Sequence, residues 1–140
     1  MLKDIPQILV TDVAVAILPA EETDTENLPP EEALWNVYIL NLKDVPIENV
    51  IVSSKGYGSY QGEHVKTSVL RQFLGNMEPN SFMPIEAIQE KVFGLNNEYW
   101  VSFYIKNDIF DKKYVFLPET IKEEFFTTVP ILNRKGVMIR

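Results

Sequence analysis

The chain has 140 residues, no cysteine, one histidine and a formal net charge of −7 at pH 7. This length fits one domain over residues 1–140, and the missing cysteines exclude disulfides, thiolate nucleophiles and cysteine-based metal sites. The acidity is local, because residues 1–50 carry ten acids and two bases (−8), whereas residues 51–140 carry eleven bases and ten acids (+1). Nucleic-acid binding requires a concentrated basic patch, and only the stretch NRKGVMIR approaches one, so we expect no nucleic-acid partner.

The N-terminal segment predicts neither export nor membrane insertion. Residues 1–20 carry Lys3 and Asp4, followed by a broken apolar run without the uninterrupted core of a signal peptide. No apolar run in the chain approaches the roughly 20 residues that cross a bilayer. We therefore expect a cytoplasmic protein without membrane insertion.

Residues 12–18 begin the series of predicted strands. Val13, Val15 and Ile17 alternate with smaller residues, which predicts a strand packed on one face. The acidic loop 19–33 follows, with three prolines, six acids and no periodicity. Its carboxylates raise the alternative of a calcium site, but no D-x-D-x-D-G spacing occurs, so we expect no metal.

The middle of the chain reads as further strands. Residues 34–42 are apolar on both faces, as in a central strand, with Trp35 as an interior anchor. Residues 50–54 return after a turn at Pro46. Residues 64–74 favour a strand, with a short helix as the alternative, and residues 81–88 predict an edge strand that Pro84 interrupts.

The clearest hairpin comes late in the chain. Residues 98–105 and 109–117 alternate on either side of the turn-forming KND. Thr120 and Glu123 then form a T-x-x-E capping box, which predicts one or two helical turns, and the tail 127–140 offers a last short strand. About seven strands with turn signals roughly every ten residues predict an all-β fold, an immunoglobulin-like antiparallel sandwich with a short C-terminal helical turn.

The stretch SSKGYGSYQGEH (53–64) raises the question of a site. Lys55 precedes the glycines, so no Walker loop is present, and Gly62 lies one position too late for a dinucleotide fingerprint. The only histidine, His64, has no G-x-S-x-G serine elbow to serve. We therefore expect a non-enzymatic chain without cofactor, and a flexible connecting loop whose Lys55, Tyr57 and Tyr60 are candidate interaction residues.

Several segments carry a resemblance to known proteins. They are WNVYILN (35–41), ENVIVSSKGYG (48–58), LNNEYWVSFYI (95–105), FDKKYVFLPE (110–119) and NRKGVMI (133–139). Together they resemble a group of small uncharacterised bacterial proteins, some of which are labelled phenylalanyl-tRNA synthetase subunit. A class II synthetase core requires a G-x-G-x-E-R-like signature that this chain lacks, so the resemblance implies no catalytic residue.

The charge distribution suggests how such a domain would function. The acidic loop at 21–32 and the basic tail at 134–140, with Arg134 and Lys135, are placed to steer a protein partner or a second copy of the chain. The apolar residues of the tail could add a strand to an open sheet edge. We therefore predict a protein-interaction module capable of self-association. The alternative is a domain that binds a small ligand or glycan through Tyr57, Tyr60 and exposed aromatic side chains.

Overall fold

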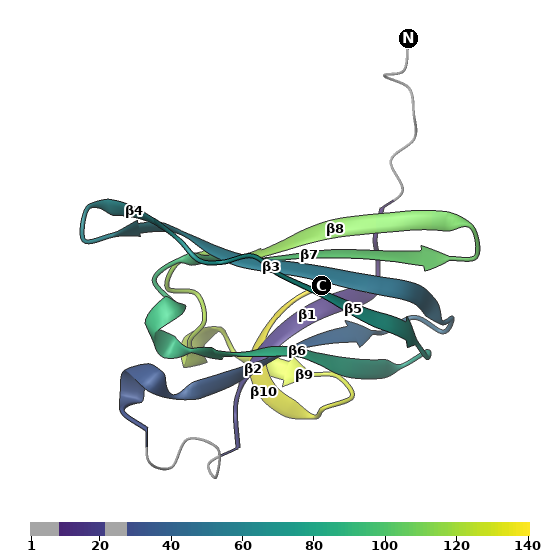
Figure 1. Ribbon diagram of the computed structural model, residues 1–140. Coiled ribbons are helices and arrows are strands. Elements are labelled where there is room, and N and C mark those ends of the chain that lie inside the picture. The colour runs from purple at the N-terminus through teal and green to yellow at the C-terminus, as the bar shows by residue number, and fades with distance from the viewer. Residues whose placement is uncertain (1–8, 22–27) are drawn as a thin grey trace.

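The computed structural model describes residues 9–21 and 28–140 and confirms the all-β sandwich (Figure 1). In the described part of the chain, ten strands form two antiparallel sheets that pack against each other around a shared apolar core. The strands are β1 (Val13–Pro19), β2 (Leu34–Asn41), β3 (Ile47–Tyr60), β4 (Glu63–Lys66), β5 (Leu70–Met77), β6 (Ser81–Gln89), β7 (Asn96–Ile105), β8 (Asp108–Phe116), β9 (Thr127–Val129) and β10 (Arg134–Ile139).

The first sheet has the order β6-β2-β1-β10-β9. The second sheet has β3, β7 and β8 as successive neighbours, and both β4 and β5 pair with the other side of β3. The structure confirms a sandwich of two antiparallel sheets, and its immunoglobulin-like character stays a prediction.

The structure has more strands than the seven we predicted. The segment 64–74 is not one strand, because β4 ends at Lys66 and β5 begins at Leu70. At the break, the side-chain oxygen of Thr67 accepts a hydrogen bond from Gly56 N at 2.7 Å, and Thr67 N donates to Gly56 O at 2.8 Å. The Thr67 side chain therefore replaces one backbone acceptor of the β-ladder. Pairing with β3 resumes at Leu70, where β5 begins.

Strand β1 is buried on both faces, so the prediction of a strand packed on one face is wrong. Val13, Val15 and Ile17 lie in the core between the sheets. The other face, with Ala14, Ala16 and Leu18, is covered by the C-terminal residues. The covering side chains are Val129, Ile131, Leu132 and Met138, from β9, β10 and the turn between them.

The C-terminal helical turn is present but begins later than the capping box predicts. It is a 3-10 turn, η4 (Glu123–Phe125), with Lys122 at its N-cap and no side-chain cap. The hydroxyl of Thr120 instead donates to Leu117 O at 2.6 Å, so it is engaged in the preceding turn. Two further 3-10 turns are η2 (Pro30–Glu32) and η3 (Glu90–Val92).

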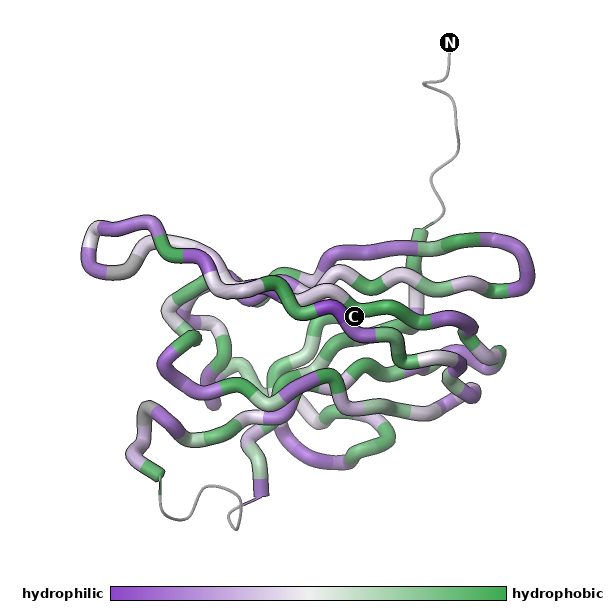
Figure 2. Tube along the Cα trace, viewed as in Figure 1, coloured by the Kyte–Doolittle hydropathy of each residue, from purple (hydrophilic) through white to green (hydrophobic). Residues whose placement is uncertain are grey.

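Trp35 is an interior anchor, as predicted. Its ring packs edge-on against Phe93 and Phe126, with centroid distances of 5.1 and 5.8 Å, and its indole N–H donates to Glu90. Figure 2 shows the hydrophilic residues along the edge strand β8 and at the tip of the β3–β4 hairpin. Within residues 9–21 and 28–140, no helix has the length and apolar character that a membrane crossing requires.

Candidate functional site

The stretch SSKGYGSYQGEH is a β-hairpin, and the prediction of a flexible loop is wrong. Strand β3 continues to Tyr60, and β4 begins at Glu63 after a turn of two residues, Gln61 and Gly62. Both turn residues have positive φ, 52° and 82°, as a type I′ hairpin turn requires. Gly56 and Gly58 lie inside the strand and not in a phosphate-binding loop. The hairpin projects from one end of the second sheet (Figure 1).

Two of the predicted interaction residues meet around a buried acid. Lys55 Nζ lies 3.7 Å from a carboxylate oxygen of Glu98, and the Tyr57 hydroxyl donates to Glu98 at 3.4 Å. Desolvation, followed by the charge and the hydrogen bond of Glu98, raises the pKa of Tyr57. Tyr60 pairs with Glu63 through its backbone, and its side chain lies outside the described part of the structure.

The other two predicted residues lie on the first sheet, where they contact their own chain. Arg134 forms an ion pair with Glu21 at 3.3 Å and donates to Pro19 O at 2.6 Å. Lys135 Nζ donates to the hydroxyl of Thr128 at 2.8 Å. The basic tail therefore reaches the beginning of the acidic loop within one molecule. Residues 22–27 of that loop lie outside the described residues.

The second sheet has an apolar outer face that we call the aromatic face. It consists of Ile51, Phe73, Trp100, Tyr104 and Ile109, with exposed fractions of 39, 66, 43, 38 and 54%. Ile51 lies opposite Phe73 on β5, and Tyr104 lies opposite Ile109 on β8. Ile51 also lies opposite Ser102, so Trp100 and Tyr104, two residues away on either side, are its diagonal neighbours. The five side chains therefore lie together on one surface.

Charged groups surround Trp100 on this face. Register places Arg71, Ser53, Trp100 and Lys113 in one row across β5, β3, β7 and β8. Lys113 Nζ lies 4.5 Å from the ring centroid, and the indole N–H donates to Asp111 at 3.4 Å. A groove of about 200 Å³ beside the ring is lined by Ser53, Ser54, Lys55, Val69, Arg71, Glu98 and Trp100. Trp100 thus borders a groove with both cationic and anionic groups.

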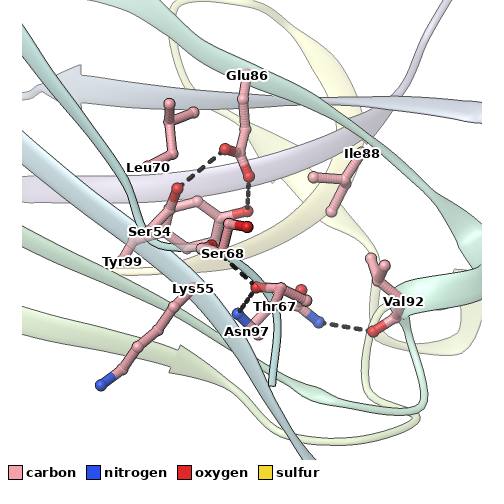
Figure 3. A pocket seen from close by; sticks show the side chains of 11 residues that line it. Ser54, Lys55, Thr67, Ser68, Leu70, Glu86, Ile88, Val92, Asn97 and Tyr99 are labelled. Atoms are coloured by element: carbon pink, nitrogen blue, oxygen red, sulfur yellow. Dashed lines mark hydrogen bonds between the residues drawn. The ribbon is translucent and has the colours of Figure 1, made fainter. Parts of the chain in front are cut away.

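A second concave region, which we call the polar cavity, opens at the break between β4 and β5 (Figure 3). Its volume is about 180 Å³. At its centre Glu86 accepts hydrogen bonds from the hydroxyls of Ser54 at 2.9 Å and Tyr99 at 3.1 Å. Burial, followed by the charge and hydrogen bond of Glu86, raises the pKa of Tyr99 well above its ordinary value of 10.0. Tyr99 therefore remains a neutral donor at pH 7.

A β-bulge places Glu86 in the polar cavity. The register between β2 and β6 shifts between Val37 and Tyr38, and Glu86 lies opposite Val37. Residues directly opposite in an antiparallel pair share one face, and Val37 belongs to the core between the sheets. Simple alternation along 81–88 assigns Glu86 to the same face as the exposed Phe82, so periodicity alone misses this site.

The histidine lines neither the groove beside Trp100 nor the polar cavity. His64 is exposed on β4, opposite Ser59. In the described ranges, no group of three or more histidine, aspartate or glutamate side chains is arranged to hold a metal ion.

Comparison with known proteins gives no match to this chain. No family model matches it, and neither a curated protein nor a solved structure matches it. The resemblance to small bacterial proteins stays a prediction.

Proposed function

We propose that the chain is a non-enzymatic, cytoplasmic protein-interaction module that forms a twofold homodimer through its aromatic face. The observation that carries the proposal is the clustering of five exposed large side chains on one side of one sheet, three of them aromatic, with exposed fractions of 66, 43 and 38%. Contiguous exposed apolar patches mark interaction sites in soluble proteins. Aromatic side chains are enriched in the buried centres of protein interfaces.

The contrast between the two outer faces of the sandwich supports this proposal. On the first sheet, residues of the β9–β10 hairpin cover the part of the outer face formed by β1, so that Ala14, Ala16 and Leu18 are fully buried, while Phe82 on the edge strand stays exposed. On the second sheet, Phe73 and Trp100 have no such cover from the described residues. A second molecule would bury the outer face of the second sheet, as the C-terminal hairpin buries β1 on the first sheet.

The charges around the aromatic face favour a second copy as the partner. The face carries cations, Arg71 and Lys113, beside an anion, Asp111, so a twofold operation can bring opposite charges together. All residues of the face also belong to segment 51–140, whose charge balance is only +1. Two copies of a chain with a net charge of −7 repel each other, but this repulsion originates mainly in residues 1–50, which do not contribute to the aromatic face.

This mode of association differs from strand addition by the tail. β10 already pairs with β1 and with β9 in the same molecule. Val137 and Ile139, which would have to leave for a partner, pack in or against the core. We therefore place the self-association surface on the aromatic face and not at the tail.

Sedimentation equilibrium over a concentration series tests the proposal. We expect a monomer–dimer equilibrium that weakens at least 30-fold in the double variant Phe73→Ser/Trp100→Ser, because central aromatic residues contribute about 2 kcal/mol or more to an interface. Leu117→Ser is the matched control, since the exposure of Leu117, 57%, lies between those of Phe73 and Trp100 but Leu117 is outside the face. A monomer at every concentration, or a dimer that the double variant leaves intact, would contradict the proposal.

A second candidate function is glycan binding by Trp100. The observation that favours it is the groove beside the indole ring, where Ser53, Arg71 and Glu98 supply polar groups next to an aromatic surface. Maltose, cellobiose and chitobiose at millimolar concentration would then change the fluorescence of Trp100. The fluorescence change would be lost in the variant Trp100→Ser. The chain would sediment as a monomer if this candidate function is correct. Unchanged fluorescence with all three sugars would exclude this candidate for neutral disaccharides.

A further inference from the structure

The polar cavity contains an anion without a cation. In the part of the chain that the structure describes, no lysine, arginine or histidine nitrogen lies within 4.0 Å of the Glu86 carboxylate. Its hydrogen-bond donors, Ser54 and Tyr99, are both neutral. A partly buried carboxylate gains stability from a cationic partner, because burial removes the water that otherwise solvates its charge.

The nearest basic side chain of the cavity wall is not placed to neutralise Glu86. Figure 3 shows the ammonium end of Lys55 extending away from Glu86. That ammonium group lies 3.7 Å from Glu98, which belongs to the outer side of the second sheet. The negative charge of Glu86 is therefore available to a ligand.

The Glu86 carboxylate has room for another hydrogen-bond donor. A carboxylate offers about four lone-pair sites on its two oxygens, and Ser54 and Tyr99 each occupy one site on different oxygens. The two bonds hold the carboxylate in place between β6 of one sheet and β3 and β7 of the other. The site is thus preorganised for an incoming N–H donor.

The remaining wall of the cavity is mixed: Lys55, Thr67, Ser68 and Asn97 are polar, and Leu70, Ile88 and Val92 are apolar. Figure 3 shows the Leu70 and Ile88 side chains beside Glu86, and Val92 farther along the cavity next to Asn97. Ser68 and Leu70 are exposed, so the cavity is accessible from solvent at the β4–β5 break. A volume of about 180 Å³ is below the roughly 300 Å³ at which pockets for whole drug-sized ligands begin. The cavity therefore fits a short alkyl chain that ends in a charged donor.

We infer that the polar cavity binds a primary alkylammonium group, with the ammonium on Glu86 and the alkyl chain against Leu70, Ile88 and Val92. The same group occurs in a free alkylamine and at the end of a lysine side chain. This inference does not depend on the aromatic face, because Trp100 and Phe73 do not line the polar cavity.

Titration of the full chain with n-butylammonium chloride, followed by amide NMR, tests this inference. We expect saturable shifts at the amides of Ser54, Glu86 and Tyr99 and at least a tenfold weaker effect from butan-1-ol, which has a similar chain without the charge. Glu86→Gln should weaken butylammonium binding at least tenfold. Glu90→Gln, at the indole of Trp35, is the matched control and should leave it unchanged.

A second titration, with the capped tripeptide acetyl-Gly-Lys-Gly-amide, distinguishes the two sources of the group. Binding of both probes assigns the cavity to lysine side chains of proteins, whereas binding of butylammonium alone assigns it to free amines. Equal shifts with butan-1-ol in the unaltered chain, or no saturable shift with butylammonium, would overturn the inference even if the Glu86 variant failed to fold.

Discussion

Gly136 and Leu18 approach so closely that no side chain fits between them. A Cβ at Gly136 would lie 2.6 Å from Leu18 Cγ and 2.7 Å from the carbonyl oxygen of Ile17. This contact allows β10 to lie against β1, with Val137 opposite Ile17. The close packing explains why a glycine stands in the last strand, where glycine otherwise weakens a strand.

Gly136→Ala should therefore destabilise the chain by about 3 kcal/mol, the upper range for overpacking, because one of the two contacts is to backbone that cannot rotate away. Urea denaturation followed by circular dichroism measures the change. Gly94→Ala is the control, since its nearest non-neighbouring atom would be a carboxylate oxygen of Glu119 at 3.5 Å. Equal midpoints for the two variants would show that the β1–β10 contact is not as tight as described.

Asn41 gives a prediction about polar groups in the core. It is fully buried, and its amide nitrogen donates to Val45 O and Glu78 O while its carbonyl accepts from Lys43 N. Asn41→Asp has the same shape but turns two donor contacts into repulsion between oxygens. We expect a loss of at least about 3 kcal/mol at pH 7, because a buried charge would face two carbonyls, and a smaller loss near pH 3. A loss independent of pH would contradict the described hydrogen bonds.

Two buried tyrosines predict how stability changes in alkali. Burial raises the pKa of both Tyr99 and Tyr114 above 10.0, and Tyr114 donates to Val13 O at 2.5 Å. In the unfolded chain each tyrosine ionises near pH 10, whereas in the folded chain it keeps its proton at that pH. Their contribution to the free energy of unfolding is therefore complete below pH 10 and is lost as the pH rises above 10. The free energy of unfolding should fall by up to about 1.4 kcal/mol per pH unit for each tyrosine.

The double variant Tyr99→Phe/Tyr114→Phe isolates this effect. It should be less stable than the unaltered chain at pH 8, because two hydrogen bonds are lost, but its stability should decline less steeply between pH 10 and 11. Urea denaturation at a series of pH values gives both quantities. Parallel declines in the two proteins would show that neither tyrosine is protected from ionisation in the fold.

Arg134 was a predicted interaction residue, and its structural role yields a different expectation. Its guanidinium bonds Pro19 O and pairs with Glu21, so it holds the end of β1 against β10. Arg134→Ala should cost about 1 kcal/mol of stability, within the range for one hydrogen bond, and leave self-association unchanged. Sedimentation and thermal unfolding of the same sample check the two parts. If Arg134→Ala weakened self-association without lowering stability, the result would indicate that the C-terminal tail forms the interface.

The fold was predictable from the sequence where one face of a strand is apolar. Alternation from Tyr99 to Ile105 correctly separated the buried Tyr99, Val101 and Phe103 from Trp100 and Tyr104. The same rule failed at β1, whose alanines are small enough to read as an outer face although distant residues 129–138 cover them. The alternation of residues within β1 cannot predict this contact, because it depends on residues more than 100 positions away in the sequence.

The candidate sites were less predictable because irregular backbone creates them. Gly56 and Gly58 suggested a loop, but both lie in a long strand whose partner breaks at Thr67, and this break opens the polar cavity. Glu86 reaches the cavity only through the bulge in β6. The bulge has one local signal, Pro84, because proline within a strand marks an edge or a bulge, but that signal does not say which face Glu86 takes. The break at Thr67 has no such signal.

The most direct measurement of the central claim is acrylamide quenching of tryptophan fluorescence as a function of protein concentration. The chain has two tryptophans: Trp35 is 9% exposed, and Trp100 is 43% exposed on the aromatic face. A neutral quencher is needed because Arg71 and Lys113, in the same row as Trp100, would attract iodide. We predict that the readily quenched fraction, due to Trp100, disappears over the concentrations at which the dimer forms. A dimer in which Trp100 remains fully quenchable, or a quenched fraction that never changes with concentration, would contradict the account.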